Sequence, residues 1–164
     1  MEHIDQIKEV LNRVHYASMA TVNEDGSPHN SPLVFLYDQS LKYCYWGSHP
    51  NSQHSQNIVR TGQAFFTVFD SIAGSVGVYI QAVDAKVAVG KELPEALQIH
   101  NRFREKANKK ALDISYYQGT NPQRMWRAKT ETVWINAYER DEKGRLLSDY
   151  KIQIDLETLD GLWN

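Results

Sequence analysis

The spacing of apolar residues predicts a helix at the start of the chain. Between residues 4 and 14 the apolar side chains recur every three or four positions, at Ile4, Ile7, Val10, Leu11 and Val14. This spacing places them on one face of an amphipathic helix. The first element should therefore pack one side against a core and leave the other in water.

After this helix, the pattern changes to short runs rich in β-branched and aromatic residues. The runs 16–23 and 31–38 flank a turn signal at Asp25-Gly26, which predicts an antiparallel hairpin. The run 41–47 alternates in side-chain type and predicts a third strand, so that the three form a meander.

The second half of the chain again contains predicted strands, with a second long helix between them. Strands are expected over 63–70 and 75–90, and a change of parity inside the second indicates either a β-bulge near Ala82 or burial of both faces. A helix is predicted over 91–110. Residues 130–155 are again rich in strand-forming residues around the turn DEKG. Residues 111–128 show no clean period, and we expect them to form a connection that contains at most a short strand.

These elements predict a mainly β protein with appended helices. Six or seven short strands in mostly adjacent antiparallel order fit a small barrel. No internal repeat, low-complexity tract or linker interrupts the pattern, so residues 1–164 are expected to form a single domain.

Composition narrows the class of partner. The formal net charge is −2, so no global field draws the protein to nucleic acid or to anionic lipid. The single cysteine, Cys44, excludes an internal disulfide and fits a reducing compartment. No run approaches the ~18 apolar residues of a membrane span, and the N-terminus is not a secretory signal. A cytoplasmic protein with no membrane partner is expected.

Several standard catalytic signatures are absent. The sequence has no GxGxxG after a strand, no phosphate loop ending in GKS or GKT, no HExxH and no GxSxG. Nucleotide hydrolysis and zinc proteolysis are therefore disfavoured, and no metal site is expected.

A polar segment over 48–62 stands out because no acidic residue occurs between Asp38 and Asp70. If a helix begins near Ser52, its free N–H groups favour negative charge at that end, and three side chains add donors: Ser52, Gln53 and His54. This is the composition of a phosphate site. The competing interpretation is that the serines and asparagines only cap a helix and the histidines lie at the surface.

Aromatic residues flank this segment on both sides. Tyr43, Tyr45 and Trp46 precede it, and Phe65, Phe66 and Phe69 follow it. A ligand with a phosphate at one end and a flat ring at the other would suit such a site. The simpler alternative is that most of these rings belong to the core.

Four segments in this order resemble the split-barrel flavin-binding family typified by pyridoxamine 5′-phosphate oxidase. They are MATVNEDGSPHNSPLVF, YCYWGSHPNSQHSQNI, FFTVFDS and GVYIQAVDAKV. The chain is especially similar to the shorter bacterial members, which are general stress or flavin-nucleotide-binding proteins. The likeness covers residues 4–90 well and 130–155 loosely.

The resemblance implies a six-stranded antiparallel split β-barrel that forms a homodimer, with FMN at the subunit interface. It places four residues of the second strand near the isoalloxazine ring: Asn30, Ser31, Pro32 and Leu33. It places Tyr45, Trp46 and Gly47 beside the ribityl chain. Ser52, Gln53 and His54 occupy the positions of the family's Ser-Arg-Lys phosphate grip, and Trp134 matches a tryptophan that the partner subunit contributes.

Two departures from the family pattern bear on function. Because Gln53 and His54 replace two cations, phosphate binding should be weaker and pH-dependent. Leu146 and Ser148 stand where the authentic oxidase has the arginine and histidine that hold pyridoxal phosphate, so that reaction is disfavoured.

The resulting expectation is an FMN-dependent oxidoreductase that acts on an unidentified small molecule, with a nicotinamide electron donor as one option. The alternatives are a haem-binding or haem-degrading split-barrel protein, a non-catalytic flavin-binding protein, and a deazaflavin in place of FMN. No catalytic side chain is evident, and His29 is a candidate only by its position. The apolar tail residues Leu159, Leu162 and Trp163 give separate support for dimerisation.

Overall fold

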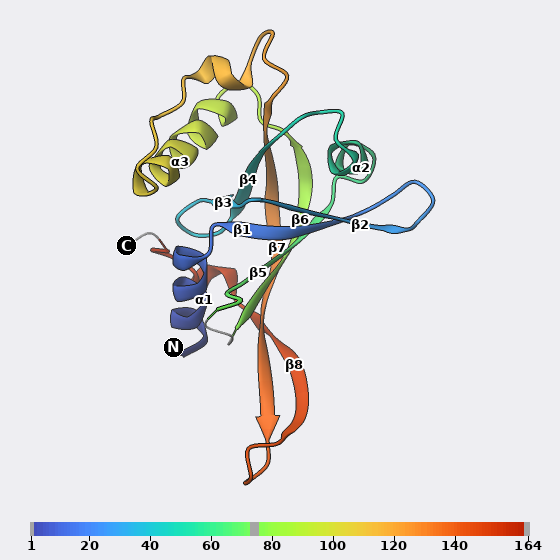
Figure 1. Ribbon diagram of the computed structural model, residues 1–164, viewed down its shortest axis with the longest axis vertical. Helices are drawn as coiled ribbons and strands as arrows, with labels where there is room; N and C mark the ends of the chain where they lie inside the picture. Colours follow the sequence, from blue (N-terminus) through green and yellow to red (C-terminus); the bar gives the residue numbers. More distant parts are fainter. Residues whose placement is uncertain (1, 73–75, 163–164) are drawn as a thin grey trace.

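One curled antiparallel sheet organises the structure, with α-helices packed around it (Figure 1). The computed structural model describes residues 2–72 and 76–162. Its regular elements, in chain order, are α1 (Glu2–Arg13), β1 (Tyr16–Val22), β2 (Pro28–Val34), β3 (Leu36–Tyr37), β4 (Tyr43–Ser48), α2 (Gln53–Thr61), β5 (Ala64–Phe69), β6 (Gly77–Val87), α3 (Glu92–Lys106), the 3-10 helix η1 (Ile114–Tyr117), β7 (Arg124–Arg140), β8 (Leu146–Ile154) and the 3-10 helix η2 (Leu156–Thr158).

The sheet curls because its two end strands follow one another in the chain. Its order is β2-β1-β5-β6-β7-β4-β3, with β8 paired to β7. Only Phe35 separates β2 from β3, so the predicted run 31–38 pairs with β1 through its first half and with β4 through its second. The predicted meander and split barrel are confirmed. Counting β2 and β3 as one bent strand gives six strands around the barrel, and β8 extends β7 beyond it.

Local predictions hold where a period or a turn residue sets the element. α2 has Ser52 at its N-cap and ends at Gly62, whose φ of 65° is the left-handed conformation that glycine adopts readily. The bulge near Ala82 is confirmed, because the β6–β7 register shifts between Gln81 and Ala82 and again before Lys86. The connection between the strands predicted over 63–70 and 75–90 lies partly outside the described residues.

The region after α3 departs from its prediction. α3 ends at Lys106, four residues early, because Asn108 turns the chain with a φ of 54°. The ambiguous stretch after it contains η1 and then the first residues of β7, which is 17 residues long.

Large side chains fill the inside of the barrel. Trp46, Phe66 and Trp126 are almost completely buried, and the two indole rings stack with centroids 6.4 Å apart. α1 adds Ile7 and Leu11 to this core. A smaller second cluster joins α3 and η1 to the outer face of β4 and β7, and it contains Leu36, Tyr45, Ala88, Leu93, Ala96, Tyr117 and Met125.

The C-terminal tail belongs to the core of its own chain. Leu159 and Leu162 are fully buried. The Leu162 N–H donates to the Gln39 carbonyl at 2.9 Å, and Asn12 Nδ2 donates to the Leu162 carbonyl at 3.0 Å. The use of Leu159 and Leu162 as support for dimerisation was therefore wrong, because their apolar surface is already covered. Trp163 lies outside the described residues.

No helix in the described part of the chain combines the length and the apolar character that a membrane crossing needs.

The tail should contribute substantially to stability. Leu162→Ala removes a fully buried side chain and is expected to lower the free energy of unfolding by about 2 to 5 kcal/mol. Leu147→Ala is the matched control, since Leu147 is 61% exposed and its loss should change stability by less than about 0.5 kcal/mol. Urea denaturation of the two variants measures both effects, and equal midpoints would contradict the assignment.

Candidate functional site

The N-terminus of α2 lies against the barrel, where α2 packs on β1, β2 and β6 (Figure 1). The helix is anchored by Asn57, whose Nδ2 donates to Thr21 Oγ1 at 3.0 Å and to Asn23 Oδ1 at 2.9 Å. Ser55 and Ile58 are also buried on this side. The anchoring fixes the first turn of α2 against β2 and the end of β4.

His54 forms the centre of a compact polar cluster at this end of α2. Its Nε2 lies 2.6 Å from Ser48 Oγ and 3.0 Å from Ser52 Oγ. Its Nδ1 lies 3.1 Å from Ser31 Oγ on β2. Ser55 completes the serine cluster, with its hydroxyl 2.9 Å from that of Ser52. One imidazole therefore joins β2, β4 and α2.

The cluster contains no fixed charge. Burial lowers the pKa of His54 below its ordinary value, and the charge of His29 lowers it further. The first turn of α2 carries no acidic residue, and the Ser52 side chain does not cap the backbone. The N–H groups of that turn and the serine hydroxyls thus form a set of donors without a fixed cation, at the end of the helix that favours anions.

Three predicted site residues, Ser31, Ser52 and His54, meet in this cluster, but Gln53 does not join them. Gln53 is exposed, and its Nε2 donates to Asn57 Oδ1 at 3.0 Å along its own helix. Sequence reasoning missed Ser48, the last residue of β4. The available signal was the short connection between the predicted strand and the predicted helix, since Ser48 and His54 lie at its two ends.

β2 divides its predicted residues between two faces. Ser31 points toward the His54 cluster, and the half-buried Leu33 packs against the core. Asn30 and Pro32 are exposed on the outer face, where Ser18 Oγ donates to Asn30 Oδ1 at 2.9 Å. This alternation follows from the two-residue period of a strand.

Trp134 lies on the same outer face but far across the sheet. The paired residues Pro32, Ser18, Thr67, Tyr79 and Trp134 form one row over β2, β1, β5, β6 and β7. Four strand spacings separate its ends, which is about 19 Å along the sheet. Trp134 stacks on Phe65 with ring centroids 6.2 Å apart. The structure therefore does not bring Trp134 to the residues of β2 within one chain.

The predicted residues of β4 lie in covered positions. The Trp46 side chain is fully buried inside the barrel, so its ring is not available to a ligand. Tyr45 is buried under the second cluster, and burial raises the pKa of its hydroxyl. A Cβ on Gly47 would lie 2.9 Å from the hydroxyl of Tyr117, which packs over that position from η1.

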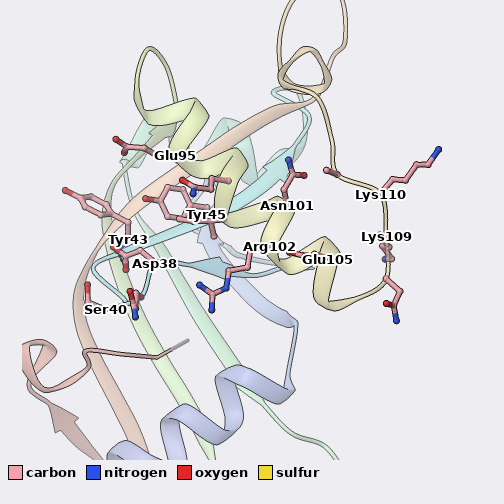
Figure 2. Close-up of a pocket in the computed structure, with 15 residues that line it drawn as sticks. Asp38, Ser40, Tyr43, Tyr45, Glu95, Asn101, Arg102, Glu105, Lys109 and Lys110 are labelled. Carbon is pink, nitrogen blue, oxygen red and sulfur yellow. Dashed lines mark hydrogen bonds between the residues drawn. The ribbon is translucent and has the colours of Figure 1, made fainter. Parts of the chain in front are cut away.

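A cavity of about 1350 Å³ lies between α3 and the β3–β4 hairpin (Figure 2). Tyr45 is the only predicted site residue that lines it. The hairpin supplies Asp38, Ser40 and Tyr43, and the facing side of α3 supplies Glu95 and Arg102. The sequence predicted the helix but not this cavity, because nothing in a single sequence shows which strand a helix faces.

The chain belongs to the pyridoxamine 5′-phosphate oxidase family, because the family model of that description matches residues 4–138. Among curated proteins, none matches at a significant level.

Solved structures of low sequence identity share the fold. A protein related to general stress protein 26, from Clostridium acetobutylicum, is 11% identical with a TM-score of 0.64, over 96% of this chain and 97% of that one. The haem storage protein HutZ of Vibrio cholerae is 18% identical with a TM-score of 0.60, over 77% and 89%. An F420 reductase is 13% identical with a TM-score of 0.56, over 77% and 94%.

His100, which contacts the Tyr117 ring that covers Gly47, should make stability depend on pH. His100 Nδ1 lies 2.8 Å from the Tyr117 hydroxyl, and burial, helped by Arg104 and Lys109, lowers the pKa of His100 from 6.5 to about 4. The unfolded chain binds this proton more readily than the folded chain between these two values. The contribution of neutral His100 to the free energy of unfolding is therefore complete above pH 6.5. It is lost as the pH falls toward 4, by at most about 1.4 kcal/mol per pH unit.

His100→Gln should flatten this acid-side loss in urea unfolding between pH 7 and 4.5. Tyr117→Phe should retain most of it, because burial of His100 is the main cause of its lowered pKa. A wild-type slope in His100→Gln would show that other groups carry the pH dependence.

Proposed function

We propose that this chain binds FMN with the phosphate at the first turn of α2. The observation that carries the proposal is the cluster of Ser31, Ser48, Ser52 and His54 around a helix N-terminus that no side chain caps. In a member of the pyridoxamine 5′-phosphate oxidase family, Ser52 and His54 occupy two of the three positions of the phosphate grip that the resemblance implies. Hydroxyls and backbone N–H groups are suitable donors to a phosphate.

The grip differs from one built on fixed cations. Its hydrogen-bonding groups are serine hydroxyls, imidazoles and backbone N–H groups, and burial lowers the pKa of His54, which disfavours its charged form. Hydrogen bonds between ionised partners are roughly twice as strong as neutral ones. FMN should therefore be held less tightly than by a Ser-Arg-Lys grip, and its affinity should depend on the charge of His54.

A second copy of the chain completes the proposed site. Asn30 and Pro32 face outward on β2, and Trp134 is four strand spacings away on the same sheet. One flavin cannot contact both within one chain, since that separation is about 19 Å. In a homodimer, the partner can supply its tryptophan, and each chain contributes to two sites.

The proposed activity is that of an oxidoreductase acting on a small molecule, with a reduced nicotinamide as a candidate electron donor. Bound FMN supplies the electron transfer itself. The protein holds the phosphate at α2 and presents the backbone of β2 to the ring. Leu146 and Ser148 lack the charge that would hold a phosphorylated pyridoxal substrate, so pyridoxamine phosphate oxidation is not proposed. A cytoplasmic location fits these small-molecule partners.

Haem and deazaflavin are the rival ligands, because HutZ and the F420 reductase share the fold. Haem needs a histidine as iron ligand, but His29 and His54 both engage the Ser31 hydroxyl. An iron bond would have to replace one of these contacts. The absorption spectrum of purified protein separates the three cofactors, and a Soret band without flavin absorption would overturn the FMN proposal.

The phosphate grip can be tested by a double substitution. Ser52→Ala with His54→Ala removes six side-chain hydrogen bonds at this end of α2 and should weaken FMN binding at least tenfold, the loss of about 1.4 kcal/mol. Riboflavin, which lacks the phosphate, should bind both proteins equally. Quenching of flavin fluorescence measures both ligands. Gln53→Ala is the control, because its side chain lies outside the cluster, and unchanged FMN affinity in the double variant would place the phosphate elsewhere.

The shared site can be tested by complementation between chains. Trp134→Ala and the Ser52→Ala/His54→Ala variant should each bind FMN poorly alone. When they are mixed and allowed to exchange subunits, each mixed dimer regains one site that combines an intact α2 with an intact Trp134. Recovery of high-affinity FMN binding is expected only in the mixture. No recovery, with subunit exchange shown by native mass spectrometry, would contradict the two-chain site.

A further inference from the structure

Two histidines share one serine hydroxyl on β2. Ser31 Oγ lies 3.1 Å from His29 Nε2 and 3.1 Å from His54 Nδ1. His29 and Ser31 are two residues apart on one strand, so their side chains lie on the same face. His54 reaches Ser31 from α2, 23 residues further along the chain. The three groups form a continuous line from β2 to the His54 cluster.

A hydroxyl has a single proton to donate, so this line has a direction. If Ser31 donates to His54, it accepts from His29, and His54 then carries its proton on Nε2, toward Ser48 and Ser52. If Ser31 donates to His29, it accepts from His54 Nδ1. His54 Nε2 is then an acceptor when the ring is neutral, and it uses a serine hydroxyl as donor. The direction of the line thus decides whether the serines can turn their hydrogens to an anion.

We propose that His29, Ser31 and His54 form a proton relay that sets the charge of the phosphate grip. An anion at Ser48 and Ser52 draws a proton onto His54 through Ser31. This inference rests on the proposed FMN function and assigns its regulation. His54 is the residue that gains charge, and Ser31 and His29 are positioning residues that deliver the proton.

The transfer balances as follows. His29 takes one proton from water and donates its Nε2–H to Ser31 Oγ. Ser31 passes its own proton to Nδ1 of His54, which already carries a proton on Nε2. His29 ends neutral and His54 ends as imidazolium, so one proton is taken up for each anion bound. Both nitrogens of His54 then donate, and the hydroxyl hydrogens of Ser48 and Ser52 are free to point at the ligand.

The charged groups around His29 and His54 favour one extra proton on this pair of histidines rather than two. His29 approaches from β2, His49 lies in the turn before α2, and Arg60 lies in the last turn of α2 with its guanidinium on the Val22 carbonyl. Asp25 in the β1–β2 turn is engaged by Ser27. Of these groups, His29 is the one whose charge acts on His54, and it disfavours a second proton. A bound phosphate supplies the opposite charge that reverses this preference.

The relay itself is tested in the free protein by nitrogen NMR of the histidine side chains, which distinguishes the two neutral tautomers. In the wild type, protonation of His29 should change the tautomer of His54. Ser31→Ala should abolish this response, and Ser31→Thr, which keeps the hydroxyl, should retain it. A response that survives Ser31→Ala would overturn the relay, because direct repulsion between the rings would then explain it.

The link to the ligand is tested by calorimetric titration of FMN in two buffers that differ in ionisation enthalpy. The wild type should take up close to one proton per FMN, and FMN affinity should fall by up to about tenfold per pH unit between pH 6.5 and 8.5. In this range the FMN phosphate is already largely dianionic. Riboflavin should show neither effect. Ser31→Ala and His29→Gln should lose the proton uptake, and Ser31→Thr should keep it.

The two proposals fail differently. FMN binding without proton uptake would overturn the relay's role and leave the proposed function standing. Absence of FMN binding, together with the coupled tautomer change in the free protein, would overturn the proposed function and the ligand link while leaving the relay itself.

Discussion

The bend at Phe35 is the constraint on which the other features depend. It lets one extended run pair with β1 and then with β4, so that the first and last strands of the sheet are joined by the chain itself. Closure defines an inside, which Trp46, Phe66 and Trp126 fill, and an outside that is free for other contacts. Phe35 is buried and packs against Phe66, with the two rings tilted and their centroids 5.1 Å apart, so the closing residue is also held by the core.

Closure also explains where the polar cluster forms. With β2 and β4 drawn around the barrel, the short connection after β4 places α2 close to Ser31. The helix then covers polar side chains that would otherwise face water, and His54 satisfies several of them at once. Burial of a polar group is costly unless the group is hydrogen-bonded. This cluster is stable because its side chains donate to and accept from one another.

Local sequence patterns predicted the helices, strands and turns well. They did not predict how distant segments contact one another. The helix period, the Asp25-Gly26 turn and the parity change near Ala82 are set by neighbouring residues, and each appears where the sequence indicates. Ser52 and His54 were predicted to lie together from the polar composition of 48–62 and a helix N-terminus, and their side chains are in contact. The alternation in β4 could not tell which of Tyr45 and Trp46 points inward, because that depends on the closed barrel. The cover of Tyr117 over Gly47 and the Ser31–His54 contact join distant segments, and no local period encodes them.

β7 is a single strand that reaches both flavin sites of the proposed dimer. The Trp126 Nε1 group donates to the Ser48 carbonyl at 3.3 Å, next to the His54 cluster, and Trp134 lies eight residues later on the outer face. In the proposed dimer, Trp134 would contact the flavin held by the partner's α2, whereas Trp126 supports the backbone beside the His54 cluster of its own chain. A displacement of β7 along its axis therefore moves a residue of both sites together. In the proposed dimer, β7 would therefore couple the two sites mechanically, without any segment that has to unfold or close.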